Sequence, residues 1–228
     1  MSASEMAVTQ IHAVTFRLIP SRFPPVDLLE RVASPDEFEV LYLIESLTND
    51  RLRDQVGDIA LVAKEDRLFG SGTSLIMAPF THPPSAGKGG RFNPDFGVFY
   101  CALDFETALA ETKYHRTKFF VDFNSPPTSV DMRELITDLG QDLNCIAGKQ
   151  KELPALYHLE DYRAGQELGK VLKQENAWGL HYSSVRASGN CCAIFRPPAL
   201  SNCRQSRHFE YAFDGKQINY VIEKSLVQ

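Results

Sequence analysis

Residues 87–112 constrain the fold of this chain most strongly, because three different local patterns follow one another without a break. The stretch begins Gly-Lys-Gly-Gly, which predicts a loop whose backbone can adopt positive φ or approach a ligand closely. Residues 97–102 then form a short apolar and aromatic run bounded by turn residues, as is typical of a buried strand. Asp104 is a favourable N-cap, and helix-forming residues follow it. The sequence therefore predicts a loop, a buried strand and a helix in succession.

Each of these three pieces carries one polar side chain that could serve chemistry. Arg91 ends the loop, Tyr100 lies on the strand, and Glu111 lies two turns into the helix. On a helical projection, Glu111 is about 100° from the centre of the apolar stripe, so it lies at the margin of that stripe. A carboxylate there can be half-buried and face a cleft beside the sheet, whereas the alternative is a solvated helix glutamate. The stripe consists of Phe105, Ala108, Leu109, Thr112 and Phe119.

The beginning of the chain predicts a flexible segment followed by a strand. Residues 1–13 are expected to be a flexible N-terminus, and residues 14–228 to form a single domain. The strand over 14–19 contains Arg17, which is unusual for an apolar strand. Arg17 is interpreted either as an edge-strand arginine that faces water or as an anion contact in a cleft.

The remaining patterns predict an α+β fold, because strands precede and follow the central helices without a βαβ rhythm. A mixed or mostly antiparallel sheet is therefore expected, with helices flanking it. In the predicted helix at 161–175, Gly165 and Gly169 are spaced to allow close packing. Residues 141–154 are expected to be irregular. Further helices are predicted at 34–47 and 49–56, strands at 74–80, 128–135, 179–185 and 191–195, and a hairpin at 209–222.

Composition and charge exclude several classes of function. The chain has 228 residues, of which 43% are hydrophobic and 23% charged, as in ordinary globular proteins. Its net charge of −5 argues against a nucleic-acid-binding surface, although a local basic cleft stays possible. The sequence shows no signal peptide and no run long enough to span a bilayer. We therefore expect a cytoplasmic protein that binds neither membranes nor nucleic acids directly.

Cofactor and metal motifs are also missing from the sequence. The six histidines and five cysteines show no metal-ligand spacing, and the cysteines are expected to be reduced thiols. The Gly-Lys-Gly-Gly run lacks the Ser or Thr of a Walker loop and precedes a strand rather than a helix. No Gly-x-Gly-x-x-Gly follows a strand, which disfavours a dinucleotide held as a redox cofactor. We expect no metal and no prosthetic group.

The polar residues that remain suit the cleavage of a nucleotide. Two arginines match the oxygens of a diphosphate, and a tyrosine ring can stack on an aromatic base. A half-buried carboxylate can stabilise an oxocarbenium ion or hold a ribose hydroxyl. These are the requirements for breaking the nicotinamide–ribose bond of NAD, which the residues alone support as one possibility among several. The set comprises Arg17, Arg91, Tyr100, Glu111 and Ser184.

Several of these segments resemble the RES family, which is named for its Arg, Glu and Ser. The resemblance covers about residues 14–222, and the first motifs are more specific than the Ser segment. Many family members have Trp at the position of Phe92. The matching segments are 16–25, 89–94, 97–102, 106–112, 179–186 and 191–197.

The resemblance implies a fold similar to that of ADP-ribosyltransferase toxins and a role as the toxin of a bacterial toxin–antitoxin pair. Such a toxin uses NAD as substrate and has an Xre-like antitoxin as its partner. Residue by residue, the resemblance assigns catalysis to Arg91, Glu111 and Ser184, with Ser183 as the competing serine. It assigns NAD binding to Arg17, Arg91, Tyr100 and Ser184.

The length of the N-terminal half resembles members that transfer ADP-ribose to a protein, which is the reaction we expect. NAD hydrolysis or phosphorolysis is the alternative, and a non-catalytic nucleotide- or protein-binding module is an alternative of another class. Segments 30–75 and 140–175 exceed the smallest members, and the resemblance assigns them no function.

Overall fold

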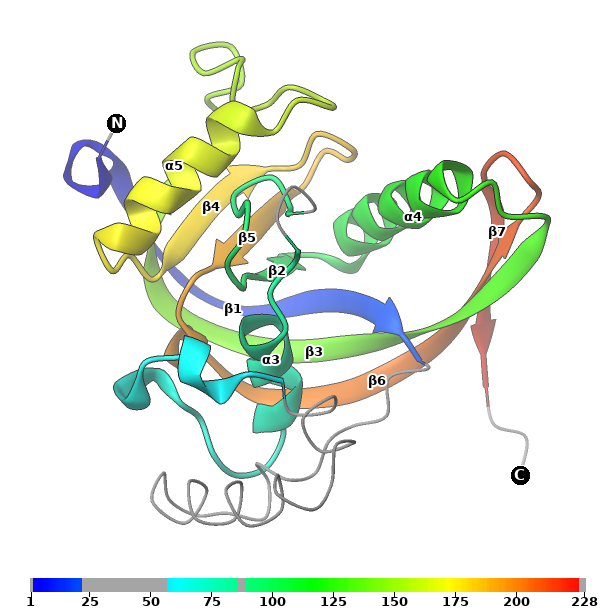
Figure 1. Ribbon diagram of the computed structural model, residues 1–228, viewed down its shortest axis with the longest axis horizontal. Coiled ribbons are helices and arrows are strands. Elements are labelled where there is room, and N and C mark those ends of the chain that lie inside the picture. The colour runs from blue at the N-terminus through cyan, green and yellow to red at the C-terminus, as the bar shows by residue number, and fades with distance from the viewer. Residues whose placement is uncertain (1, 22–56, 86–88, 226–228) are drawn as a thin grey trace.

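The computed structural model describes residues 2–21, 57–85 and 89–225. The helices predicted at 34–47 and 49–56 lie outside the described residues, as do the first and second residues of the Gly-Lys-Gly-Gly run. The described part is a mixed sheet with helices on both faces (Figure 1). This confirms the predicted α+β class.

Seven strands form the sheet in the order β1-β2-β5-β4-β3-β6-β7, and β1 also pairs with β3. Among the described strands, β3 and β4 are parallel and the other pairs are antiparallel. Because β1 contacts both β2 and β3, the five strands β1, β2, β5, β4 and β3 close into a ring. The strands are β1 (Ala7–Pro20), β2 (Phe99–Ala102), β3 (Thr128–Cys145), β4 (Gly179–Ser183), β5 (Asn190–Ile194), β6 (Leu200–Phe213) and β7 (Ile218–Lys224).

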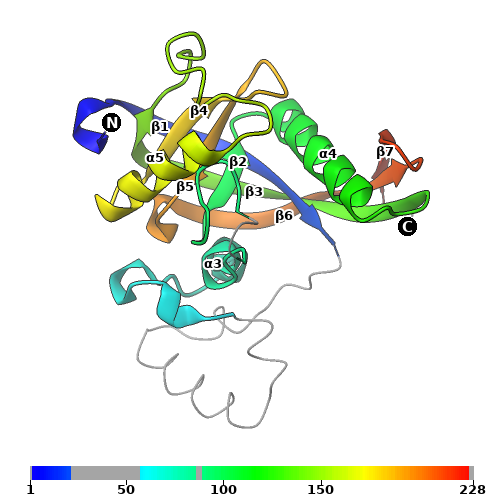
Figure 2. The same ribbon diagram turned by 45° about the horizontal axis from the view of Figure 1, so that its top comes forward.

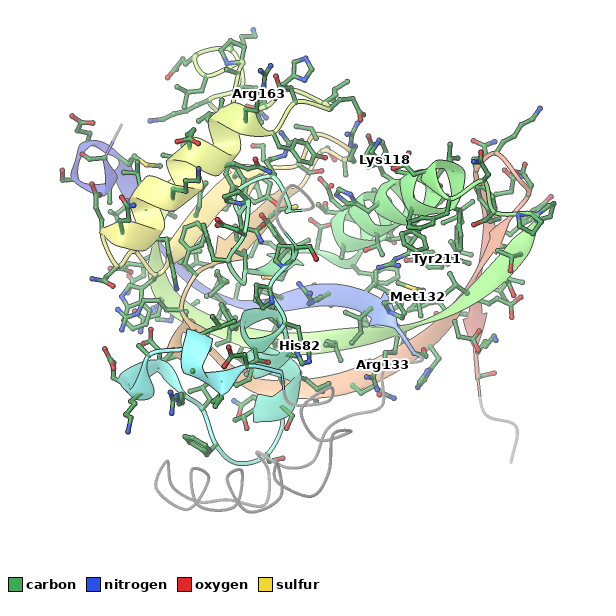
Figure 3. All side chains as sticks on the ribbon, in the orientation of Figure 1. His82, Lys118, Met132, Arg133, Arg163 and Tyr211 are labelled. Carbon is green, nitrogen blue, oxygen red and sulfur yellow. The ribbon has the colours of Figure 1, made fainter. Side chains whose placement is uncertain are left out.

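The helices divide between the two faces of the sheet. α4 (Phe105–Asp122) and α5 (Arg163–Gln174) cover one face, and α3 (Thr73–Thr81) covers the other (Figures 1 and 2). The alternation of β3 serves both faces: Met132 packs into the cluster with α4 and α5, whereas Leu135 and Leu139 pack with α3. Figure 3 shows Met132 and Tyr211 between α4 and the curved strands, and both are fully buried.

Short 3₁₀ helices complete the described elements: η1 (Ala3–Glu5), η2 (Ile59–Leu61), η3 (Lys64–Asp66) and η4 (Pro197–Ala199). None of the described helices is both long and apolar enough to cross a membrane. All five cysteines are free, as expected.

Three strands are longer than predicted, and one of them is β6, which begins at Leu200 instead of residue 209. The flexible N-terminus expected at 1–13 is wrong for residues 7–13, because β1 begins at Ala7 and pairs with β3 from there. Val8 is 60% exposed and the first buried residue of this strand is Ile11, so the residues before Ile11 are held by backbone pairing. Likewise, part of the irregular segment expected at 141–154 continues β3 as far as Cys145.

The strand predicted at 74–80 is wrong, since these residues form α3. The run is apolar on almost every side, and Ile76, Met77 and Phe80 are all buried. A short run in which nearly every residue is apolar has no periodicity that separates a helix from a strand. Gly72, with φ of 76°, precedes the helix in the left-handed conformation that favours glycine.

Candidate active site

A cavity of about 560 Å³ lies where β1, β2, β5 and α4 meet. This volume is within the range of small-molecule sites. Four of the five predicted site residues line it, although they come from distant parts of the sequence: Arg17, Arg91, Tyr100 and Glu111. The structure therefore brings these four residues together at one cavity.

The position of Glu111 follows from the start of α4. The Asp104 side chain accepts a hydrogen bond from the backbone N–H of Thr107, which confirms the predicted cap. Two turns later, the Glu111 side chain is 20% exposed and faces the cavity. Of the two interpretations of Glu111, the half-buried carboxylate is therefore the correct one. The predicted apolar stripe is wrong at its far end, because Phe119 is 42% exposed and Phe120 is buried instead.

Ser184 is the serine that contacts Glu111. Its Oγ donates a hydrogen bond of 2.5 Å to Glu111 Oε1 and accepts hydrogen bonds from the backbone N–H groups of Arg186 and Ala187. Ser184 is not among the described residues that line the cavity, and its hydroxyl is joined to the cavity wall by the bond to Glu111.

The neighbouring Ser183 points elsewhere. Its Oγ donates to Asn190 Oδ1 at 3.1 Å and accepts from the backbone N–H of Gly148 at 3.0 Å. These contacts join the end of β4 to β5 and to the segment after β3. The geometry therefore separates the two adjacent serines, which the sequence left open.

His115 follows Glu111 by one turn of α4. Its Nε2 is 3.8 Å from Glu111 Oε2, and its side chain is 53% exposed at the edge of the cavity. Desolvation lowers the pKa of His115, and the Glu111 carboxylate opposes this shift. The sequence reasoning missed this residue, although the i, i+4 spacing on a predicted helix could have indicated it.

Tyr100 is fixed by the loop that precedes its strand. Its hydroxyl donates to Asn93 Oδ1 at 2.6 Å and accepts from the backbone N–H of Phe92 at 2.9 Å. Burial raises the pKa of Tyr100, so the phenol stays protonated. Asn93 also accepts from the backbone N–H of Gly90 and donates to the carbonyl of Phe96. Asn93 was not among the predicted residues, but it organises the loop that carries Arg91.

The two arginines reach the same cavity from different elements. Arg17 on β1 donates to the Tyr100 carbonyl at 2.7 Å, and its guanidinium lies 4.7 Å from the centre of the Phe99 ring. Burial lowers the pKa of Arg17. Because Arg17 lines the cavity, the alternative of an edge-strand arginine facing water is wrong.

Arg91 is held by α5 and by the segment before it. Its Nη1 donates to the carbonyls of Leu156 and His158 at 3.0 and 2.8 Å, and its guanidinium is 4.6 Å from the centre of the Tyr162 ring. A Cβ at Gly165 would lie 2.4 Å from the Arg91 carbonyl oxygen, which is too close for any other residue. The close packing predicted for the glycines of this helix is thus confirmed, and it allows α5 to lie directly against the loop that carries Arg91.

Two cations, a carboxylate and aromatic rings therefore share one cavity. This arrangement suits a ligand that carries negative charge at one end and an electron-poor centre near Glu111. Among the described residues, no group of three or more His, Cys, Asp or Glu side chains is placed to hold a metal ion.

Comparisons with known proteins agree with this picture. A family model described as RES domain matches residues 64–214. A relative in Sinorhizobium fredii (strain NBRC 101917 / NGR234), called "Uncharacterized protein y4oC", is 31% identical over 209 residues, which are 90% of this chain and 85% of the relative. The crystal structure of the M.tuberculosis MbcT-MbcA toxin-antitoxin complex contains a chain that is similar with a TM-score of 0.50 and 12% identity. That likeness covers 93% of this chain and 90% of the other, and it shows the fold.

Proposed function

Because the chain belongs to the RES domain family, we propose that it is the toxin of a type II toxin–antitoxin pair, which cleaves the nicotinamide–ribose bond of NAD and transfers ADP-ribose to a protein. The observation that carries the proposal is the Ser184–Glu111 hydrogen bond at a cavity that also holds Arg17 and Arg91. The similar fold of a chain from a toxin–antitoxin complex supports the toxin role.

In the proposed reaction, the bond between ribose C1′ and the nicotinamide nitrogen breaks, and its electron pair leaves with nicotinamide. The Glu111 carboxylate stabilises the positive charge that develops on the ribose, and Ser184 keeps that carboxylate oriented. A nucleophile on the acceptor then bonds to C1′ and releases its proton to solvent. The chain needs no prosthetic group for this chemistry, since NAD is the substrate.

The remaining residues bind the substrate in this proposal. The guanidinium groups of Arg17 and Arg91 hold the diphosphate, because each planar guanidinium can donate two parallel hydrogen bonds to phosphate oxygens. Tyr100 packs at the nicotinamide–ribose end while its hydroxyl holds the loop of Asn93. The acceptor decides between the proposed transferase and the alternative, an NAD hydrolase or phosphorylase.

Nicotinamide release from NAD by the purified chain tests the proposal, with and without phosphate and cell lysate. Glu111→Gln keeps the shape of the side chain but removes its charge, so we expect a loss of release of about 100- to 1,000-fold with the fold unchanged. Label transfer to a lysate protein identifies a transferase, and phosphate dependence identifies a phosphorylase. Absence of release from folded wild type in every condition would favour a non-catalytic binding module.

A toxin that consumes NAD in the cytoplasm would inhibit growth, so a partner must keep it inactive. We propose that an Xre-like antitoxin encoded beside it binds this chain. Co-expression of the two should give a complex that co-purifies and releases less nicotinamide than the free chain. Failure of the two proteins to co-purify would count against this partner.

A further inference from the structure

Residues 154–162, which we call the strap, lie between β3 and α5 and rest against Arg91. Two strap carbonyls, of Leu156 and His158, accept hydrogen bonds from Arg91 Nη1, and the Tyr162 ring lies against the guanidinium. Arg91 is only 8% exposed, so protein groups rather than water surround it, and those that the guanidinium contacts here belong to the strap. The position of this arginine therefore depends on the position of the strap.

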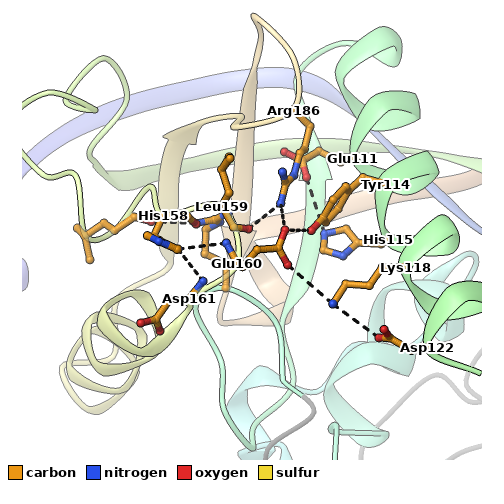
Figure 4. Close-up of polar contacts among 12 residues, drawn as sticks. Glu111, Tyr114, His115, Lys118, Asp122, His158, Leu159, Glu160, Asp161 and Arg186 are labelled. Carbon is orange, nitrogen blue, oxygen red and sulfur yellow. Dashed lines mark hydrogen bonds and ion pairs between the residues drawn. The ribbon is translucent and has the colours of Figure 1, made fainter. Parts of the chain in front are cut away.

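The other side of the strap is fastened by Glu160. Figure 4 shows its carboxylate among three side chains: Tyr114 and Lys118 come from α4, and Arg186 comes from the β4–β5 turn. It accepts a hydrogen bond from the Tyr114 hydroxyl and lies 3.8 Å from Lys118 Nζ and 3.5 Å from Arg186 Nη2. The same Arg186 donates to the Leu159 carbonyl at 2.6 Å and stacks 3.4 Å from the centre of the Tyr114 ring.

The protonation states suit these contacts at neutral pH. Burial and the hydrogen bond to Glu160 raise the pKa of Tyr114 to about 12, so the hydroxyl remains a donor. The hydrogen bond from Tyr114 lowers the pKa of Glu160, so the carboxylate remains charged. Several contacts converge on one carboxylate, which makes the fastening stronger than an isolated surface ion pair.

The fastening stands apart from the cavity. Among the described residues that line the cavity, neither Glu160 nor its partners Tyr114, Lys118 and Arg186 is present. Glu160 can reach a ligand along two routes: through the strap to Arg91, or through Arg186, whose backbone N–H donates to Ser184 Oγ. The strap route ends on Arg91, which itself lines the cavity.

We infer that Glu160 is a positioning residue for substrate binding, which fastens the strap across α4 so that the strap carbonyls hold Arg91 at the cavity wall. This inference rests on the proposed function for the identity of the ligand, the diphosphate of NAD. It also gives a role to part of the long segment between β3 and α5.

The test compares Glu160→Ala with Glu160→Gln and with Glu152→Ala, a matched control on the same exposed segment. We expect Glu160→Ala to raise the KM for NAD about three- to tenfold with kcat within about twofold of wild type. Glu160→Gln keeps an acceptor for Tyr114 and should recover part of the loss, whereas Glu152→Ala should change nothing. A fall in kcat without a change in KM would overturn the inference.

A double-mutant cycle separates positioning from general stability. If Glu160 acts through Arg91, Glu160→Ala should add less than about twofold to KM in an Arg91→Ala background. An equal effect of Glu160→Ala in both backgrounds would refute the coupling.

Hydrogen exchange of the strap amides needs no activity. Glu160→Ala should speed exchange over 154–162, and unchanged exchange would overturn the fastening. If wild type releases no nicotinamide, the proposed function fails, and the exchange result still decides whether Glu160 fastens the strap.

Discussion

Replacing Ser184 by Ala tests whether this hydroxyl acts through Glu111. The substitution removes the donor that lies 2.5 Å from Glu111 Oε1. A hydrogen bond to a charged group contributes about 1.5–3 kcal/mol, and each 1.36 kcal/mol corresponds to about tenfold in rate. If this contact orients the carboxylate in the transition state, nicotinamide release should fall about 10- to 150-fold.

Ser183→Ala is the control, because Ser183 is the adjacent serine and its hydroxyl also makes local hydrogen bonds. Ser184 Oγ accepts from two backbone N–H groups, and Ser183 Oγ contacts Asn190 and Gly148. Ser183→Ala should therefore lower the free energy of unfolding by about 1–2 kcal/mol, and Ser184→Ala, which also loses the bond to the Glu111 carboxylate, by about 1.5–3 kcal/mol or more. Only Ser184→Ala should lower the rate of nicotinamide release by an order of magnitude or more.

The assay measures nicotinamide release and denaturant unfolding on the same samples of wild type and both variants. A much larger loss of rate in Ser184→Ala than in Ser183→Ala, with both variants folded under the assay conditions, would support the assignment. A larger loss of rate in Ser183→Ala than in Ser184→Ala would refute the reasoning, because Ser183 has no contact with Glu111 among the described residues.

Two further predictions concern stability. Glu134 is fully buried and accepts two side-chain hydrogen bonds from Arg207. Arg207→Ala would leave this carboxylate buried without its partner, so the free energy of unfolding measured by urea titration should fall by about 3 kcal/mol. A loss under about 1 kcal/mol would contradict this prediction. His181 is buried and desolvation lowers its pKa, so the unfolded chain binds a proton more readily and stability should be lost as pH falls below about 6.5. His181→Gln should flatten the change in Tm between pH 7.5 and 5, and an unchanged slope would assign the loss to other groups.

The parts of the site that the sequence could predict depend on short-range patterns. Asp104 caps α4 as an N-cap residue should, and Glu111 then follows at the margin of the apolar stripe. The strand of Tyr100 is a short buried run between turns, which is also a local signal. Periodicity and capping were sufficient for these elements because neighbours in the sequence determine them.

The parts that could not be predicted depend on contacts between distant segments. Ser183 and Ser184 are chemically identical, and only the course of the chain after β4 decides which one meets Glu111. Arg91 contacts Leu156, which lies 65 residues away in a segment with no recognisable pattern. The strand predicted at 74–80 is wrong because nearly all residues of this run are apolar, so the sequence shows no helical periodicity although the run forms α3.

The pairing of β1 with β3 has a consequence for the order in which the protein is made. Thr15 on β1 bonds to Thr137 on β3 across 122 residues, and Arg17 lies on the same strand pair. A ribosome that adds about 5–20 residues per second needs about 6–24 s to bridge that separation. Arg17 therefore reaches the cavity only after most of the chain has emerged, and the nascent N-terminal part cannot assemble the site on its own.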